Sequence, residues 1–222
     1  MDVLWEMEKE RSIMEILVTG FEPFAGDKVN PSYEAVKALP SEIDGCLIRK
    51  AEIPVCFRTG SEMVLRLLQK NSYDAVICTG LAGGRCAVTL EVCAINLMHA
   101  RIQDNAGYKP VWEKILPDGE DGIFSSLPVR AMDEELKKEG IPSSLSFSAG
   151  TFVCNEVMYS LLAFLRERGE DIPAGFIHVP YADEYERRDI DAFSMPVGQI
   201  VNALTACIRV LVREIRGTRK TS

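Results

Sequence analysis

Apolar residues gather in short runs, most of them closed by glycine or proline, and this pattern predicts buried strands. Four segments show it: residues 13–20 (IMEILVTG), 73–80 (YDAVICTG), 175–180 (GFIHVP) and about 92–97. Apolar runs of this length are typical of strands whose two faces are both covered. Residues 21–31 and 108–128 are rich in glycine, proline and polar side chains, so we expect loops there.

Between the strands, apolar residues recur at spacings of three and four, which predicts amphipathic helices. Helices are expected at residues 32–39, 61–71, 129–140, 154–168 and 196–217. Ser61 is a candidate N-cap, and Gly140 suits the position just after a helix end. The last helix carries the most regular apolar stripe, made of Ile200, Ala203, Leu204, Cys207, Ile208, Leu211, Val212 and Ile215.

This alternation of strands and helices predicts an α/β fold: a three-layer α/β/α sandwich around a mixed, mostly parallel twisted sheet. The chain of 222 residues shows no internal repeat and no low-complexity linker. We therefore expect a single domain over residues 14–222. Residues 1–13 mix acidic and basic side chains and precede the first convincing strand, so a short N-terminal extension is expected there.

Charge and cysteine usage narrow the classes of function. The net charge is −8, whereas a nucleic-acid binder needs a basic surface. No apolar run is long enough to cross a membrane. The beginning of the chain lacks the apolar core of a secretory signal. Seven cysteines without a CxxC pair indicate reduced thiols and a cytoplasmic protein. With only two histidines, a Cys/His zinc site would lack its usual ligand spacing.

Three glycine-containing loops follow predicted strands or extended segments: TGFEPFAG, TGLAGGR and SAGTFVC. In α/β sheets, ligands bind beyond the carboxyl ends of strands. Cys154 closes the third loop at the first turn of a helix, where the partial positive charge favours the nucleophilic thiolate. The alternative is a packing role on the apolar face of the helix, in line with Met158 and Leu161.

A nucleophilic thiol needs a general base, and His178 and His99 are the available histidines. His178 is favoured because it ends a strand before a loop, although it could equally be a structural histidine. Glu91 stands among apolar residues and could orient an imidazole as the third member of a triad. It could also be an ordinary strand-edge glutamate paired with Arg85.

Several separated motifs together resemble one family. SAGTFVCN, GLAGGRCAVTLEVCAIN, TGFEPFAG with VNPS, ARIQDNAG and GFIHVPY resemble the type I pyroglutamyl peptidases, in the family's order and over nearly the whole chain. The resemblance implies a phosphorylase- or hydrolase-like sandwich and a cysteine peptidase that removes N-terminal pyroglutamate (5-oxoproline) from peptides. It also implies no metal, no cofactor and a homotetramer.

The resemblance assigns the catalytic roles to Cys154, His178 and Glu91, and it implies hydrolysis through a thioester. The backbone N–H of Cys154 would meet the oxyanion, with Arg101 as a second donor. The residues implied to surround the pyroglutamyl ring are Phe21, Phe24, Asn30, Leu81, Phe152 and Val153. An apolar, partly aromatic pocket suits a small flat lactam with one amide edge.

Three positions depart from the family's pattern. Leu81 stands where many bacterial members have glutamine, Val92 stands where a basic residue is usual, and VPYADEY replaces the commoner sequence after the histidine. Two other functions stay open at this point. TGLAGGR could cradle the phosphate of a phosphorolytic transferase. Alternatively, the chain could be a binding protein without turnover.

Overall fold

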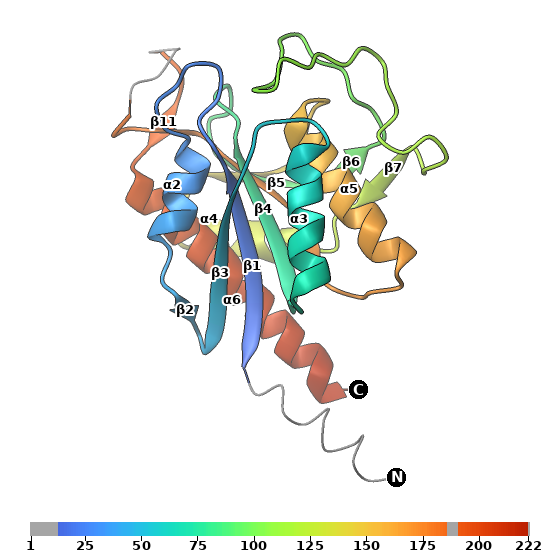
Figure 1. Cartoon of the computed structure of the whole chain (residues 1–222). Helices are drawn as coiled ribbons and strands as arrows, with labels where there is room; N and C mark the ends of the chain where they lie inside the picture. Colours follow the sequence, from blue (N-terminus) through green and yellow to red (C-terminus); the bar gives the residue numbers. More distant parts are fainter. Residues whose placement is uncertain (1–12, 186–190, 222) are drawn as a thin grey trace, which may run out of the picture.

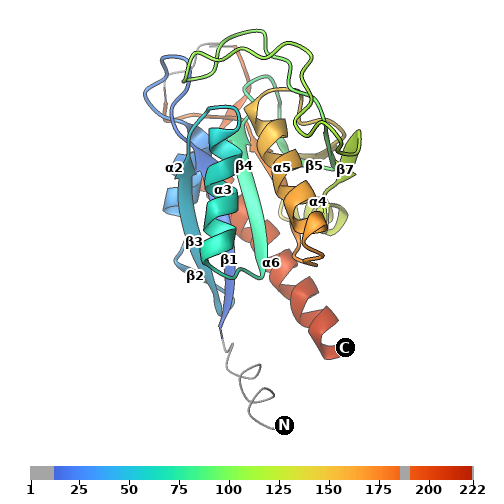
Figure 2. The same ribbon diagram turned by 45° about the vertical axis from the view of Figure 1, so that its right-hand side comes forward.

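The computed structural model describes residues 13–185 and 191–221, and Figure 1 shows how the elements are arranged. Helices lie on both sides of one central sheet, and long loops gather at one end of the molecule (Figures 1 and 2). The extension expected over residues 1–13 falls, apart from its last residue, outside the described part of the chain. The layered α/β/α architecture is confirmed.

Within the described residues, the central sheet has seven strands in the order β2-β3-β1-β4-β9-β5-β8. They are β1 (Met14–Phe21), β2 (Glu42–Ile43), β3 (Cys46–Ile53), β4 (Ala75–Leu81), β5 (Val88–Glu91), β8 (Ser143–Ser146) and β9 (Ala174–Val179). β3, β1, β4 and β9 run parallel, whereas β5 runs antiparallel to β9 and carries β8 parallel to itself. The sheet is therefore mixed and mostly parallel, as predicted.

The apolar runs correctly locate the buried strands β1, β4 and β9. The strand expected at residues 92–97 is wrong in its bounds. β5 ends at Glu91, and the chain continues as β6 (Cys93–Ile95), which pairs with β7 (Gly122–Phe124) in a separate small sheet. The segment 108–128, expected as loop, therefore contains a strand. A second small sheet joins β10 (Tyr181–Ala182) to β11 (Ser194–Met195).

The helices divide between the two faces of the sheet. They are α2 (Pro31–Ala38), α3 (Thr59–Lys70), α4 (Val129–Lys138), α5 (Val153–Glu167) and α6 (Val197–Thr221). α2, α4 and α6 pack on one face, and α3 and α5 pack on the other (Figures 1 and 2). Each face buries its own apolar cluster, so two cores hold the three layers together.

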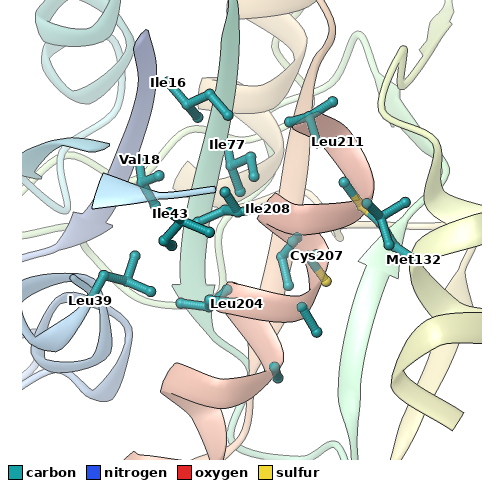
Figure 3. Packing of buried hydrophobic residues seen from close by; sticks show 14 of the residues in the cluster. Ile16, Val18, Leu39, Ile43, Ile77, Met132, Leu204, Cys207, Ile208 and Leu211 are labelled. Carbon is teal, nitrogen blue, oxygen red and sulfur yellow. The ribbon is translucent and has the colours of Figure 1, made fainter. Parts of the chain in front are cut away.

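The stripe on the last helix faces the sheet. Leu204, Ile208 and Leu211 lie against Ile16 and Ile77 of the central strands (Figure 3). All eight stripe residues are buried, which confirms the helical spacing as a packing pattern. Burying one such aliphatic side chain stabilises a fold by roughly 1.5–3 kcal/mol before entropy is counted.

Helix ends follow local chemistry, with one correction. Gly140 has a φ of +70° and follows α4, as expected for a residue that lacks a Cβ. Ser61 is not an N-cap, because α3 begins two residues earlier, at Thr59. Its hydroxyl is buried and donates to the Glu156 carboxylate at 2.6 Å. Asn30, by contrast, caps α2 by accepting from the backbone N–H of Ser32 at 3.1 Å.

Candidate active site

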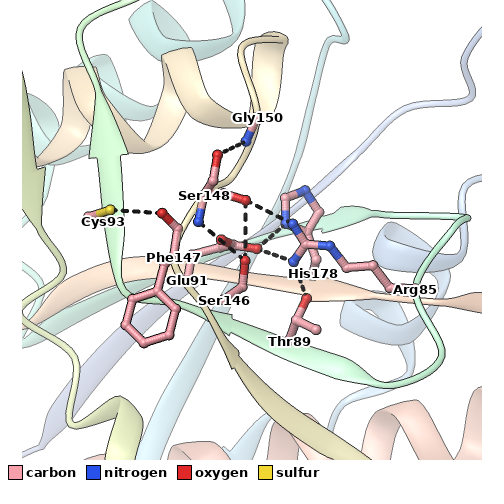
Figure 4. A network of polar contacts seen from close by, with 9 residues as sticks. All are labelled: Arg85, Thr89, Glu91, Cys93, Ser146, Phe147, Ser148, Gly150 and His178. Carbon is pink, nitrogen blue, oxygen red and sulfur yellow. Dashed lines mark hydrogen bonds and ion pairs between the residues drawn. The ribbon is translucent and has the colours of Figure 1, made fainter.

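His178 and Glu91 meet on one face of the sheet. His178 of β9 pairs with Thr89 of β5, and side chains alternate between faces, so Glu91 shares the face of Thr89 and lies diagonally from His178. His178 Nδ1 is 2.8 Å from Glu91 Oε1 (Figure 4). Both side chains are almost fully buried, with Glu91 0% and His178 4% exposed. Glu91 is therefore not an ordinary strand-edge glutamate, although it does pair with Arg85, as that alternative expected.

Arg85 completes the surroundings of this carboxylate. Its guanidinium donates to Glu91 Oε1 and Thr89 Oγ1, and at 2.9 Å to the backbone carbonyl of Ser148 (Figure 4). Burial would raise the pKa of Glu91, but the hydrogen bond from His178 and the charge of Arg85 outweigh it and hold that pKa below its ordinary value. Glu91 is thus an ionised, buried carboxylate.

Cys154 reaches the same face from the covering layer. It is the second residue of α5 and is partly buried. A Cβ added to Gly80 would lie 3.0 Å from its sulfur, and Gly80 pairs directly with His178 in the β4–β9 ladder. The thiol therefore sits over the strand position next to the imidazole. The described residues give no hydrogen bond between the two groups.

Electrostatics correct one expectation about the nucleophile. Burial, together with the smaller effect of the Glu91 charge, raises the pKa of the Cys154 thiol to about 12. Burial also lowers the pKa of His178 below its ordinary value, against the raising effect of Glu91. The resting pair is a neutral thiol and a neutral imidazole, so the helix N-terminus does not by itself produce a thiolate.

Cys154 opens onto an apolar cavity of about 150 Å³. Five of the residues expected around the ring line it: Phe21, Phe24, Asn30, Leu81 and Phe152. The Phe24 and Phe152 rings lie 5.3 Å apart. Cys154 is consequently not enclosed in the helix core in the way that Met158 and Leu161 are.

Two expected residues lie elsewhere. Val153 is fully buried beside Val157 in the core under α5 and is not among the lining residues. Arg101 is exposed on the loop after β6 and is also not among them. The other histidine, His99, is joined to Thr151 by backbone hydrogen bonding and contacts the Trp112 ring instead.

Sequence reasoning missed other residues at this site. Asp27, Val29 and Val55 also line the cavity; the first two belong to a loop already singled out, whereas Val55 follows a strand that was not predicted. The motifs also did not predict a hydrogen-bonded contact between Asn105 and Glu22, which we call the Asn105–Glu22 clamp. Asn105 donates to Glu22 Oε1 at 2.8 Å, and the same oxygen accepts the Val55 N–H at 3.1 Å.

The glycine loop after β4 is poorly suited to cradle a phosphate. The N–H of Ala82 donates to the Val179 carbonyl at 2.9 Å, and the N–H of Arg85 donates to the Ala82 carbonyl at 3.0 Å. A Cβ at Gly83 would lie 2.4 Å from the Tyr181 ring, so the loop packs against that ring. In the described part of the chain, no cluster of His, Cys, Asp or Glu has the makings of a metal site, and no helix is long and apolar enough to span a membrane.

Comparisons with known proteins point to one family. A family model described as pyroglutamyl peptidase matches residues 14–214. The pyrrolidone-carboxylate peptidase of Thermosipho africanus is 46% identical, over 90% of this chain and 98% of its own. The pyroglutamyl peptidase I structure from Bacillus amyloliquefaciens has a TM-score of 0.86 at 38% identity, covering 90% and 95% of the two chains. The pyrrolidone carboxyl peptidase structure from Thermococcus litoralis has a TM-score of 0.88 at 33% identity, covering 93% and 96%.

Proposed function

This chain belongs to the pyroglutamyl peptidase family and is a pyroglutamyl-peptidase I hydrolase, and we propose that it works through a triad of Cys154, His178 and Glu91. The observation that carries the proposal is the buried Glu91–His178 hydrogen bond of 2.8 Å beside a thiol that opens onto an apolar cavity. Its substrates are peptides that begin with pyroglutamate.

The cavity accounts for recognition of the ring. Phe24 and Phe152 offer flat apolar surfaces. Leu81 stands where many bacterial members of the family have glutamine, and it adds an aliphatic wall in place of that amide. A lactam ring would gain from leaving water in such a cavity, and loop backbone groups would meet its amide edge. The thiol at the rim then faces the carbonyl carbon attached to the ring.

The proposed reaction begins with proton transfer from Cys154 to His178, because both groups are neutral at rest. The sulfur attacks the pyroglutamyl carbonyl, the tetrahedral intermediate collapses, and imidazolium gives its proton to the leaving amine of the shortened peptide. Water, deprotonated by His178, then hydrolyses the thioester and releases pyroglutamate and free thiol. Glu91 holds the imidazole in one tautomer and stabilises its cationic form.

The oxyanion would be met by the backbone N–H of Cys154. This group belongs to the first turn of α5, where N–H groups lack intrahelical acceptors and point out of the helix. One such donor is typically worth about 3–4 kcal/mol of transition-state stabilisation. Arg101 stays a second, less direct candidate, because it is exposed on a neighbouring loop.

The proposal extends to a single catalytic domain over residues 14–222, a homotetramer and a cytoplasmic location without metal or cofactor. The tetramer and the lack of cofactor rest on family resemblance, and the location rests on seven free cysteines. Light scattering of the purified chain measures the assembly directly.

The test is release of amine from a pyroglutamyl chromogenic amide at neutral pH under reducing conditions. Wild type, Cys154→Ser and Cys86→Ser are compared, since Cys86 is an exposed cysteine away from the cavity. We expect turnover that only Cys154→Ser abolishes, and none of a prolyl amide. Activity retained by Cys154→Ser would refute the nucleophile, and turnover that requires added phosphate would favour a phosphorolytic transferase.

A further inference from the structure

One oxygen atom of the proposed triad has two partners, a guanidinium and an imidazole. Glu91 Oε1 accepts from Arg85 and also lies 2.8 Å from His178 Nδ1 (Figure 4). Arg85 comes from the loop after β4, is 27% exposed in its side chain, and has no counterpart in the usual description of a three-residue triad.

Arg85 also connects the two segments that supply the reacting groups. It binds Thr89 and Glu91 of β5, and it binds the carbonyl of Ser148 in the segment that leads to Cys154. The Ser148 hydroxyl in turn accepts the N–H of Gly150 at 3.2 Å. A planar guanidinium is suited to fix several acceptors at once, which an ammonium cannot do with the same geometry.

We propose that Arg85 is a positioning residue of the peptidase reaction: by sharing Glu91 Oε1 with His178, it keeps the imidazole neutral and ready to accept the Cys154 proton. The inference rests on the proposed triad and deepens it. Burial opposes imidazolium and holds the pKa of His178 below its ordinary value, whereas Glu91 favours imidazolium, which cannot act as the base. The positive charge of Arg85 offsets part of that attraction.

The charged and titratable groups around His178 are few. Glu91 faces it from β5, Arg85 from the glycine loop, and Cys154 from α5. From β4, the side chain nearest this set is the buried thiol of Cys78. On α2, which also packs near β9, the charged Glu34 and Lys37 pair with each other. Among the residues that the structure describes, removing Arg85 therefore leaves Glu91 as the one charged group that acts on the imidazole.

The experiment measures the pH dependence of kcat/KM and the NMR titration of His178 in wild type, Arg85→Gln and Arg85→Lys. Only two histidines are present, so a His99→Gln variant identifies the His178 signal. Arg66→Gln is the matched control, because it also removes an arginine from a carboxylate pair, on the exposed face of α3. The acid limb of kcat/KM reports the base in the free enzyme.

In Arg85→Gln we expect the acid limb and the His178 titration to move upward together by about one pH unit. The reason is that the Glu91 carboxylate then stabilises the imidazolium without the opposing positive charge of Arg85. Arg66→Gln should leave both in place. Arg85→Lys keeps the positive charge but loses the planar guanidinium that binds several acceptors at once. The His178 titration should therefore stay near that of wild type, while kcat falls about tenfold.

A folded Arg85→Gln protein with an unchanged acid limb and an unchanged His178 titration overturns the inference. Should Arg85→Gln fail to fold, Arg85→Lys decides alone, and a wild-type kcat in that variant overturns it equally. The NMR titration needs no turnover. An inactive wild type would contradict the proposed function, and the effect of Arg85 on His178 would still be measured.

Discussion

A single methyl group at Gly80 tests whether the position of the thiol matters. In Gly80→Ala, the new Cβ would lie 2.9 Å from Phe176 Cζ and 3.0 Å from Cys154 Sγ, whereas ordinary contacts begin near 3.4 Å. Phe176 is fully buried and packs against Phe21 and His178, at ring distances of 6.3 and 4.7 Å. Because the ring is enclosed and the sulfur borders a cavity, we expect the sulfur to move.

The magnitude follows from the overlap, which is about half an ångström on each contact. Overpacking of this kind costs about 1–3 kcal/mol of folding free energy. A displacement of 1 Å in a reacting group can cost about a hundredfold in rate. We therefore expect Gly80→Ala to lose about 1 kcal/mol in urea unfolding and tenfold to a hundredfold in kcat.

The matched control is Gly84→Ala in the loop that follows β4, where an added Cβ meets nothing within 4 Å and no positive φ is needed. Both variants are assayed for chromogenic amide turnover and for urea unfolding. Gly84→Ala should behave as wild type. A folded Gly80→Ala enzyme with wild-type kcat would show that the thiol does not depend on this close approach, and the steric reasoning would be refuted.

Three further predictions concern the surroundings of the site. Asn105→Ala removes the donor to Glu22 at the cavity wall and should raise KM about threefold to tenfold with little change in kcat, as steady-state kinetics would show; an unchanged KM contradicts it. Burial raises the pKa of Glu156 in the folded state, so the fold binds more protons than the unfolded chain and loses stability as pH rises above the ordinary glutamate range. Urea unfolding between pH 5 and 8 should show that loss in wild type and not in Glu156→Gln, whose side chain keeps Ser61 as a partner; parallel curves would disprove it. Leu211→Ala empties part of the core under α6 and should cost 2–5 kcal/mol in urea unfolding, with a loss below 1 kcal/mol as the contrary result.

The sequence predicts elements whose pattern is long or uniform. The apolar runs of β1, β4 and β9 and the stripe of α6 are of this kind, and the structure confirms them. β3 escaped because it lies next to the short edge strand β2, where the run CLIRKAEI mixes buried and exposed positions. β5 has only four residues, too few to separate from the chain that follows it.

In the candidate site, too, some features follow from local sequence patterns and others only from the fold. Cys154, Glu91 and His178 are recognised through motifs, whereas their meeting depends on the antiparallel register of β5 on β9, which no local pattern encodes. The expected thiolate fails because burial outweighs the helix N-terminus. The Asn105–Glu22 clamp joins residues 83 positions apart, so only the folded chain reveals it.

The side chains of the site lie on two kinds of segment, strands inside the sheet and loops at its end. Glu91 and His178 belong to neighbouring strands in the hydrogen-bonded interior of the sheet, whereas Phe24, Asp27 and Phe152 belong to connecting segments. Loop residues tolerate substitution far better than strands packed on both sides. Substitutions in these loops can thus change which N-terminal residue the cavity accepts, whether in descendants of this chain or by directed evolution, while the buried Glu91–His178 pair stays in place.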